Sequence, residues 1–302
     1  MITQEVREVL EKQKYKIVGR HSAVKACHWL RQKLLNNRAC YKEKFYGISS
    51  HRCIQMTPSV SWCTQKCIFC WRPIELTQGT EIKEEDDPKA IVEGSIRAQR
   101  IILTGYGGIM DRIDSKMLEE ARNPKHAAIS LAGEPTLYSK IGGLIEEFHN
   151  SGFTTFLVTN GTRPDRLESL EEEPTQLYLS LDAPNEHIYN IINAPIKSDG
   201  WKRINETLEL LSSFKCNTVI RITCVRGYNM TDLKGYAKLI EKGEPTFVEP
   251  KSYMHVGYSR RRLDREDMPS FNEIMNFGEE LASLTGYEIK DFSRESKVVL
   301  LA

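Results

Sequence analysis

The sequence predicts an α/β protein, most simply an open (βα)6 partial TIM barrel with an N-terminal helical extension. From about residue 126 onward, short β-branched segments alternate with amphipathic helical segments. This alternation is typical of βαβ units that build a parallel sheet. With one more strand just before the cysteine motif described below, the chain offers about six βα repeats, fewer than the eight of a closed barrel.

The elements are expected in a simple order. Residues 1–52 form the extension, because VREVLEKQ and AVKACHWLRQKLL both have helical apolar periodicity. Residues 53–302 form one catalytic domain with a C-terminal extension. Strands are expected at 54–60, 127–132, 154–160, 177–183, 218–225 and 246–253. Helices are expected at 138–152, closed by Gly152, and at 201–214, whereas 71–125 gives no clear pattern.

Composition excludes some classes of protein. The 302 residues are 40% hydrophobic and 27% charged, and no apolar segment approaches the roughly 18 to 20 residues that span a bilayer. The charged N-terminus lacks the apolar core of a secretory signal, so we expect a cytoplasmic protein with no membrane partner. The net charge of +1 gives no general sign of nucleic-acid binding, which must therefore depend on local patches.

Three cysteines form the clearest motif. Cys63, Cys67 and Cys70 have CxxxCxxC spacing directly after an expected strand. A structural zinc site uses four protein ligands, whereas a [4Fe-4S] cluster held by three thiolates leaves one iron open to another molecule. The motif therefore favours an iron-sulfur cluster that binds an exogenous ligand.

Three further cysteines lie upstream with equal spacing. Twelve residues separate Cys27 from Cys40, and twelve separate Cys40 from Cys53. Free cysteines are often inert buried residues, and this is our interpretation of Cys216 and Cys224. The upstream three have polar neighbours, which favours a second three-cysteine cluster with an open iron.

The motif with Phe69 before its last cysteine, CxxxCxFC, resembles the signature of the radical S-adenosylmethionine (SAM) superfamily. That resemblance implies a radical SAM partial barrel whose open iron binds SAM and cleaves it to a 5′-deoxyadenosyl radical. LAGEP, TNG and SLD then follow successive strands, although each alone is an ordinary turn. The SAM-binding residues implied are Gly133, Glu134, Pro135, Thr159, Asn160, Ser180 and Asp182, with Arg221 and Asn229 as weaker candidates.

The chain closely resembles the tRNA 4-demethylwyosine synthases over nearly its whole length. The upstream cysteines carry this resemblance, together with the segments SHRCIQ, PSVSWC and KSYMHVGYS. Members act on N1-methylguanosine at position 37 of tRNA(Phe), in the anticodon loop, and add two carbons from pyruvate. The resemblance implies two [4Fe-4S] clusters, with pyruvate at the second. The 62 residues before Cys63 leave no room for the flavodoxin-like domain of eukaryotic members, so we expect a separate electron donor, a ferredoxin or flavodoxin-like protein.

The same resemblance suggests catalytic and tRNA-binding residues. A lysine that forms an imine with pyruvate is expected to be Lys251, with Lys25 and Lys125 as further candidates, although a single lysine is more often an exposed charge. The tRNA-binding candidates are Arg260, Arg261, Arg262, Tyr253, His255 and Tyr258. Two alternatives stay open: another radical SAM enzyme with an auxiliary cluster, or a non-catalytic zinc or iron-sulfur module that binds RNA.

Overall fold

The computed structural model describes residues 1–302, the side chains of Met110 and Asp111 excepted. The chain divides into two units, which are described separately. The first unit comprises Met1–Cys63, Gln78–Val158 and Ser169–Thr175. The second comprises Thr64–Thr77, Thr159–Glu168 and Gln176–Ala302.

The first unit contains a parallel array of three strands with an antiparallel hairpin on its edge. Parallel pairs join β3 to β4 and β4 to β5, and the hairpin of β1 and β2 pairs antiparallel with β3 through β2. The strands are β1 Lys16–Val18, β2 Ser22–Val24, β3 Cys53–Thr57, β4 His126–Ile129 and β5 Thr154–Thr159.

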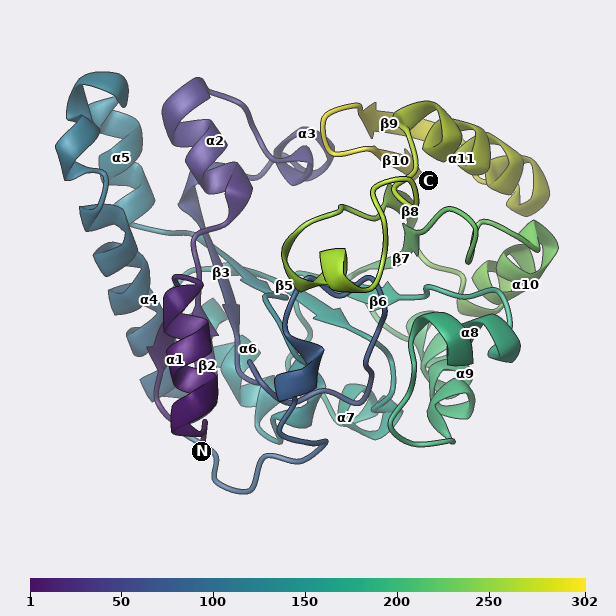
Figure 1. Cartoon of the computed structure of the whole chain (residues 1–302), viewed down its shortest axis with the longest axis horizontal. Helices are drawn as coiled ribbons and strands as arrows, with labels where there is room; N and C mark the ends of the chain where they lie inside the picture. The colour runs from purple at the N-terminus through teal and green to yellow at the C-terminus, as the bar shows by residue number, and fades with distance from the viewer. The chain divides into compact units, whose positions relative to one another are not determined.

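Helices of the first unit begin at residues that satisfy their first amides. Thr3 caps α1, and Asp87 caps α4, whose first residue is Pro88. α4 packs against α5, α6 and the hairpin (Figure 1). The helices are α1 Gln4–Lys12, α2 His28–Asn36, α3 Tyr41–Tyr46, α4 Pro88–Thr104, α5 Ser115–Arg122 and α6 Ile141–Asn150, with short 3-10 turns at Ser50–Arg52, Gly107–Arg112 and Pro135–Leu137.

The second unit contains another parallel array, here with an antiparallel C-terminal pair. β6 pairs with β7 and β7 with β8 in parallel, whereas β10 pairs antiparallel with both β8 and β9. The strands are β6 Gln176–Ser180, β7 Asn217–Cys224, β8 Phe247–Ser252, β9 Ile289–Ser293 and β10 Val298–Leu301.

Helices of the second unit pack in sequence, α9 against α10 and α10 against α11 (Figure 1). Ser270 and Glu273 form a capping box at the start of α11, and Gly286 ends that helix with a φ of +77°. The helices are α7 Pro164–Glu168, α8 Glu186–Ile192, α9 Gly200–Leu211, α10 Leu233–Gly243 and α11 Phe271–Thr285, with 3-10 turns at Ile74–Leu76 and Gly257–Arg261.

All six expected parallel strands are present within a few residues of their predicted bounds. The expectation of a helical extension over residues 1–52 is wrong in part, because β1 and β2 lie between α1 and α2. Each of these strands has only three residues. β2 is stabilised by pairing with β3, where Ala23 lies opposite Thr57, a residue distant in sequence. A short strand that depends on a distant partner carries too little local periodicity to be predicted.

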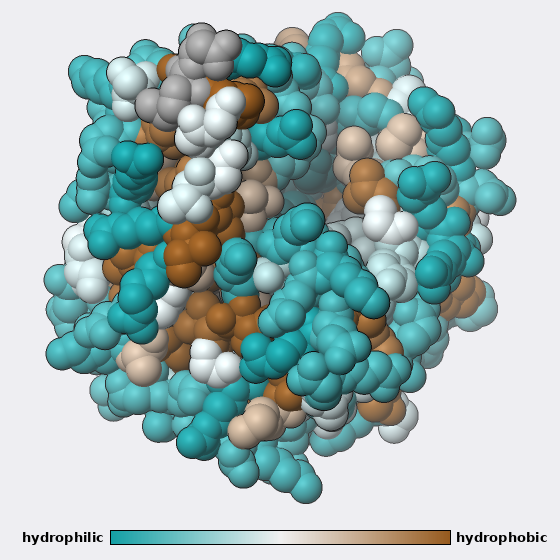
Figure 2. All heavy atoms as spheres, turned by 60° about the vertical axis from the view of Figure 1, so that its left-hand side comes forward, coloured by the Kyte–Doolittle hydropathy of each residue, from teal (hydrophilic) through white to brown (hydrophobic). Residues whose placement is uncertain are grey.

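The surface is mainly polar on the face drawn in Figure 2, where hydrophilic side chains predominate and hydrophobic ones form a narrower band. Among the described residues, no helix is both long and apolar enough to cross a membrane.

Candidate functional site

The three upstream cysteines lie at the ends of secondary-structure elements in the first unit. Cys27 precedes α2, Cys40 precedes α3, and Cys53 is the first residue of β3. Burial raises the pKa of the Cys53 thiol to about 12; Cys27 and Cys40 also raise it, whereas the charge of Lys42 lowers it. Cys27, Cys40 and Lys42 therefore lie close enough to Cys53 for their charges to act on its thiol.

Lys42 is a residue that the sequence analysis missed. It is only 9% exposed, and its Nζ lies 4.4 Å from the centre of the Phe156 ring. Its charge also lowers the pKa of the Cys27 thiol, against the larger effect of burial. In the sequence, the one feature that could have indicated Lys42 as a site residue is its position two residues after Cys40. Only the packing of α3 shows that this lysine is buried.

The three predicted lysines occupy different environments. Lys251 lies in β8, where its Nζ donates a hydrogen bond of 2.6 Å to the carbonyl of Ser296. Lys25 is half-buried over the Tyr15 ring, and burial lowers its pKa. Lys125 is exposed at the amino end of β4, which is the wrong end of a parallel strand for a catalytic residue and argues against this candidate.

In the second unit, the segment Thr64–Thr77 carries Cys67 and Cys70. Asn193, which is 2% exposed, places its Nδ2 3.5 Å from the Cys67 sulfur and 3.5 Å from Asp182 Oδ2. The Asn193 Oδ1 is buried without a hydrogen-bond partner among the described residues. The Asn193 amide therefore links the candidate cluster ligand Cys67 to the buried carboxylate of Asp182. Asn193 was also missed by the sequence analysis.

The candidate SAM residues lie at the carboxyl ends of strands in both units. In the first unit, Gly133 has a φ of +71°, and a Cβ there would come within 1.8 Å of the Ser59 carbonyl, so only glycine fits. Glu134 is 1% exposed and accepts hydrogen bonds from the amide and hydroxyl of Thr136. Pro135 starts the following turn. The GEP tripeptide is therefore a tightly packed turn and not a free loop.

In the second unit, the candidates after β5 and β6 are held by hydrogen bonds. Asn160 Nδ2 donates to Thr64 at 2.9 Å, and Thr159 accepts from the Gly161 amide. Asp182 is 5% exposed and accepts from the Thr223 amide at 2.8 Å, while burial raises its pKa.

The two weaker candidates and Ser180 lie nearby. Ser180 ends β6 and is paired in register with Arg221 of β7, whose guanidinium lies over the Tyr178 ring. Asn229 binds the carbonyls of Asp182 and Thr223, so its amide joins the ends of β6 and β7 and has a structural role.

The predicted tRNA-binding residues divide into exposed and buried groups. Arg260 and Arg261 are exposed, and Arg261 lies 4.5 Å from the centre of the Tyr258 ring. Tyr253 is only 2% exposed and its hydroxyl binds His255 and Ser259, so the prediction that its ring stacks on RNA is wrong for this structure.

Arg262 also differs from the prediction. Its side chain is turned toward the cysteine segment, where it binds the Ile68 carbonyl and Glu75.

An iron-sulfur cluster and a single metal ion require different arrangements of protein ligands. In the part of the chain that the structure describes, no three His, Cys, Asp or Glu side chains converge on one metal ion. A cubane cluster binds each cysteine through a different iron, so its thiolates stand around a larger body. The described residues thus form no single-ion site, and the assignment of clusters depends on the spacing of the cysteines.

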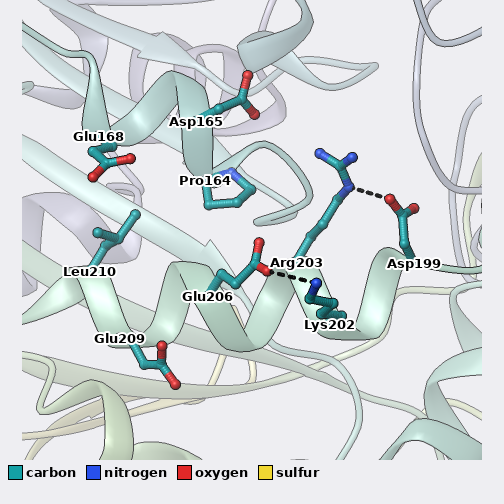
Figure 3. Close-up of a pocket in the computed structure, with 9 residues that line it drawn as sticks. All are labelled: Pro164, Asp165, Glu168, Asp199, Lys202, Arg203, Glu206, Glu209 and Leu210. Carbon is teal, nitrogen blue, oxygen red and sulfur yellow. Dashed lines mark hydrogen bonds and ion pairs between the residues drawn. The ribbon is translucent and has the colours of Figure 1, made fainter.

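A hollow of about 430 Å³ lies between α7 and α9, away from the cysteine motifs in sequence. Figure 3 shows its charged lining, in which Arg203 pairs with Asp199 at 2.7 Å and Lys202 with Glu206 at 3.7 Å. These pairs connect neighbouring turns of α9, as is usual on a solvated helix face. The hollow is therefore a groove on the surface and not the candidate site.

Comparison with known proteins gives concordant matches. The family model described as Radical SAM superfamily matches residues 57–240, and the one described as Wyosine base formation matches residues 242–302. The chain is 55% identical to S-adenosyl-L-methionine-dependent tRNA 4-demethylwyosine synthase of Pyrococcus abyssi, covering 99% of this chain and 88% of the relative. It is 46% identical to the enzyme of that name from Methanocaldococcus jannaschii, covering 100% and 96%.

A solved structure described as TYW1 with a lysine-pyruvate adduct bound also matches. It superimposes with a TM-score of 0.91 at 46% identity and covers 100% of this chain and 96% of that one. This match confirms the predicted α/β fold, an open partial barrel of the radical SAM type.

Proposed function

The chain belongs to the radical SAM superfamily and, within it, to the tRNA 4-demethylwyosine synthases, and we propose that it converts N1-methylguanosine-37 of tRNA(Phe) to 4-demethylwyosine. It is an enzyme that uses SAM and a [4Fe-4S] cluster, as membership of the superfamily implies. We propose pyruvate as the two-carbon donor.

We propose two clusters in the chain. The first is held by Cys63, Cys67 and Cys70, on the strength of their spacing. The second is held by Cys27, Cys40 and Cys53 from the N-terminal 52 residues and the start of β3. It is supported by their equal spacing and by the effect of Cys27 and Cys40 on the pKa of the Cys53 thiol. When bound, the first cluster and SAM together supply the 5′-deoxyadenosyl radical that starts the reaction.

We propose Lys42 as the residue that binds pyruvate. The neighbouring solved structure contains a lysine-pyruvate adduct. In this chain, Lys42 is a buried lysine whose charge acts on the thiols of Cys27 and Cys53, and its Nζ lies 4.4 Å from the centre of the Phe156 ring. Its Nζ would condense with the pyruvate carbonyl carbon and release water, which fixes the two-carbon unit in one place. Lys251, Lys25 and Lys125 then become the weaker candidates.

We propose that the exposed arginines contact the tRNA anticodon loop. Arg260 and Arg261 lie on one 3-10 turn, and Tyr258 offers an aromatic ring beside them. Guanidinium groups bind phosphate oxygens, so this surface suits the backbone of the loop while nucleotide 37 enters the site. A separate ferredoxin or flavodoxin-like protein would supply electrons, and a reducing cytoplasm would preserve the thiols.

The observation that carries this function is the presence in one chain of the CxxxCxFC segment and of three upstream thiols, partly buried, with the buried Lys42 near them. The test is anaerobic turnover of reconstituted protein with dithionite, SAM, pyruvate and tRNA(Phe) bearing N1-methylguanosine-37, followed by nucleoside mass spectrometry. The proposal expects the tricyclic nucleoside, and none without pyruvate. Formation of 5′-deoxyadenosine with unchanged tRNA would reject the substrate and keep the radical SAM chemistry.

A further inference from the structure

Arg262 differs from the two arginines before it. Its side chain is 15% exposed, and its Nε donates a hydrogen bond of 3.0 Å to the carbonyl of Ile68. A second guanidinium nitrogen donates to the carbonyl of Cys70, and the third forms an ion pair of 2.9 Å with Glu75. One planar group therefore holds three points of the segment that carries Cys67 and Cys70.

The backbone next to Arg262 contacts the same segment. The Tyr258 amide donates a hydrogen bond of 2.9 Å to the Trp71 carbonyl. Gly257 has a φ of +59°, and a Cβ there would come within 2.4 Å of that carbonyl. Residues 257–262 therefore lie directly along residues 68–75.

The cysteine segment has little regular structure of its own. Between residues 64 and 73 the structure assigns no helix or strand to it, apart from a single bridge of Gln65 to Pro195. Its internal backbone bond is from the Cys70 amide to the Cys67 carbonyl, at 3.0 Å. Contacts from outside must therefore fix the direction of the two thiols. The amides of Lys66 and Ile68 bind the carbonyls of residues 193 and 192 before Cys67 and just after it, and Arg262 binds the carbonyls on both sides of Phe69.

We propose that Arg262 is a positioning residue for the cluster-binding segment, and that it does not contact tRNA phosphate. The guanidinium fixes the peptide planes at Ile68 and Cys70, and so presents Cys67 and Cys70 at the spacing a cluster requires. This proposal rests on the proposed function for the identity of the cluster, but the hydrogen bonds from Arg262 to the segment are independent of it.

The test compares Arg262→Gln with Arg260→Gln and Arg261→Gln, which remove the same charge from the same turn. The first measurement is hydrogen exchange of residues 64–77 in the iron-free full-length protein. Charged hydrogen bonds contribute enough that their loss should speed exchange by about tenfold or more in Arg262→Gln. The control variants should leave exchange in this segment unchanged.

The second measurement follows iron per chain and the electron paramagnetic resonance spectrum of the reduced, reconstituted protein. We expect Arg262→Gln to lose iron and to show an altered spectrum. Arg262→Lys keeps the positive charge but loses the planar guanidinium with its several donors, so its iron content and spectrum should lie between those of the wild type and Arg262→Gln. This variant also serves as the test if Arg262→Gln does not fold. Glu75→Gln should have the smallest effect, since the two carbonyl bonds remain.

Two outcomes would overturn the proposal. In one, Arg262→Gln and Arg262→Lys show wild-type exchange, iron and spectra, and only their tRNA affinity falls. In the other, all three arginine variants behave alike. A wild-type protein that binds no iron would instead reject the proposed function, while the exchange measurement would still decide the role of Arg262.

Discussion

The two groups of cysteines are held in place in different ways. In the first unit, Cys27, Cys40 and Cys53 stand at the ends of α2, α3 and β3, so regular structure sets their backbone positions. In the second unit, the segment of Cys67 and Cys70 has almost no regular structure, and it is held by backbone hydrogen bonds to residues 192–196 and 258 together with side-chain bonds from Asn193 and Arg262. The first arrangement is a property of the fold, whereas the second can be altered by single side chains that bind no metal.

The largest effect should come from removing one cysteine of each group. Cys53→Ala should lower iron from about eight to about four per chain and abolish tRNA product, while 5′-deoxyadenosine still forms. Cys67→Ala should abolish both products, because the proposed SAM-binding cluster is lost. Iron analysis and chromatography of the two products check this. If both variants lost 5′-deoxyadenosine formation equally, this would contradict the proposal that the two clusters have separate roles.

The next largest effect concerns Lys42. Lys42→Ala should lower tRNA product on the order of 10²-fold or more, because covalent attachment is what positions pyruvate. Borohydride reduction with labelled pyruvate should mark the wild-type chain and not this variant. Lys44→Ala, on the exposed face of the same helix α3, is the matched control and should be labelled normally. Label that disappears in Lys251→Ala instead would return the role to the residue favoured by the sequence.

Substitution of Asn193 should have a moderate effect on the cluster proposed at Cys63, Cys67 and Cys70. Asn193→Leu removes the amide that contacts Cys67 and Asp182, so the reduction potential of the cluster should fall, because hydrogen bonds to cluster sulfur favour the reduced form. The iron-free protein should lose about 1–3 kcal/mol of unfolding free energy. Redox titration and denaturant unfolding measure these quantities. Asn190→Leu, exposed on the same helix, should change neither.

The smallest effect should come from substituting His21, a buried residue directly before the second strand of the β1–β2 hairpin and shortly before Cys27. His21 is fully buried, contacts the Pro58 carbonyl and accepts from the Asp86 amide, and burial lowers its pKa below 6.5. The unfolded chain therefore binds the proton first, so stability present above pH 6.5 is lost as the pH falls through and below that value. His21→Ala should be less stable by about 1–3 kcal/mol at pH 7. This difference should narrow at lower pH, and a constant difference across pH 5 to 7 in unfolding experiments would contradict it.

The sequence predicted the parallel strands well because each is a short, largely apolar segment followed by a polar turn. It identified two groups of cysteines from their spacing, and their role as cluster ligands stays a prediction. It missed the β1–β2 hairpin, whose pairing with β3 is distant in sequence.

The candidate site was less accessible to prediction. The sequence missed Lys42 and Asn193, because burial and an unsatisfied buried acceptor exist only in the folded chain. It also grouped Arg262 with its two neighbours, since three consecutive arginines give no sign of which side chain turns inward.

The position of Cys27 at the beginning of α2 has a further consequence. The start of a helix carries partial positive charge and stabilises an anion there. Cys27 makes no side-chain capping hydrogen bond in this structure, but the amides of Trp29 and Leu30 act against the increase that burial causes in the pKa of its thiol. A thiolate bound to iron would therefore cap the helix better than a protonated thiol does. Loss of iron in air would then loosen the first turn of α2, and proteolysis near residue 27 would report oxidative damage before the sheet is affected.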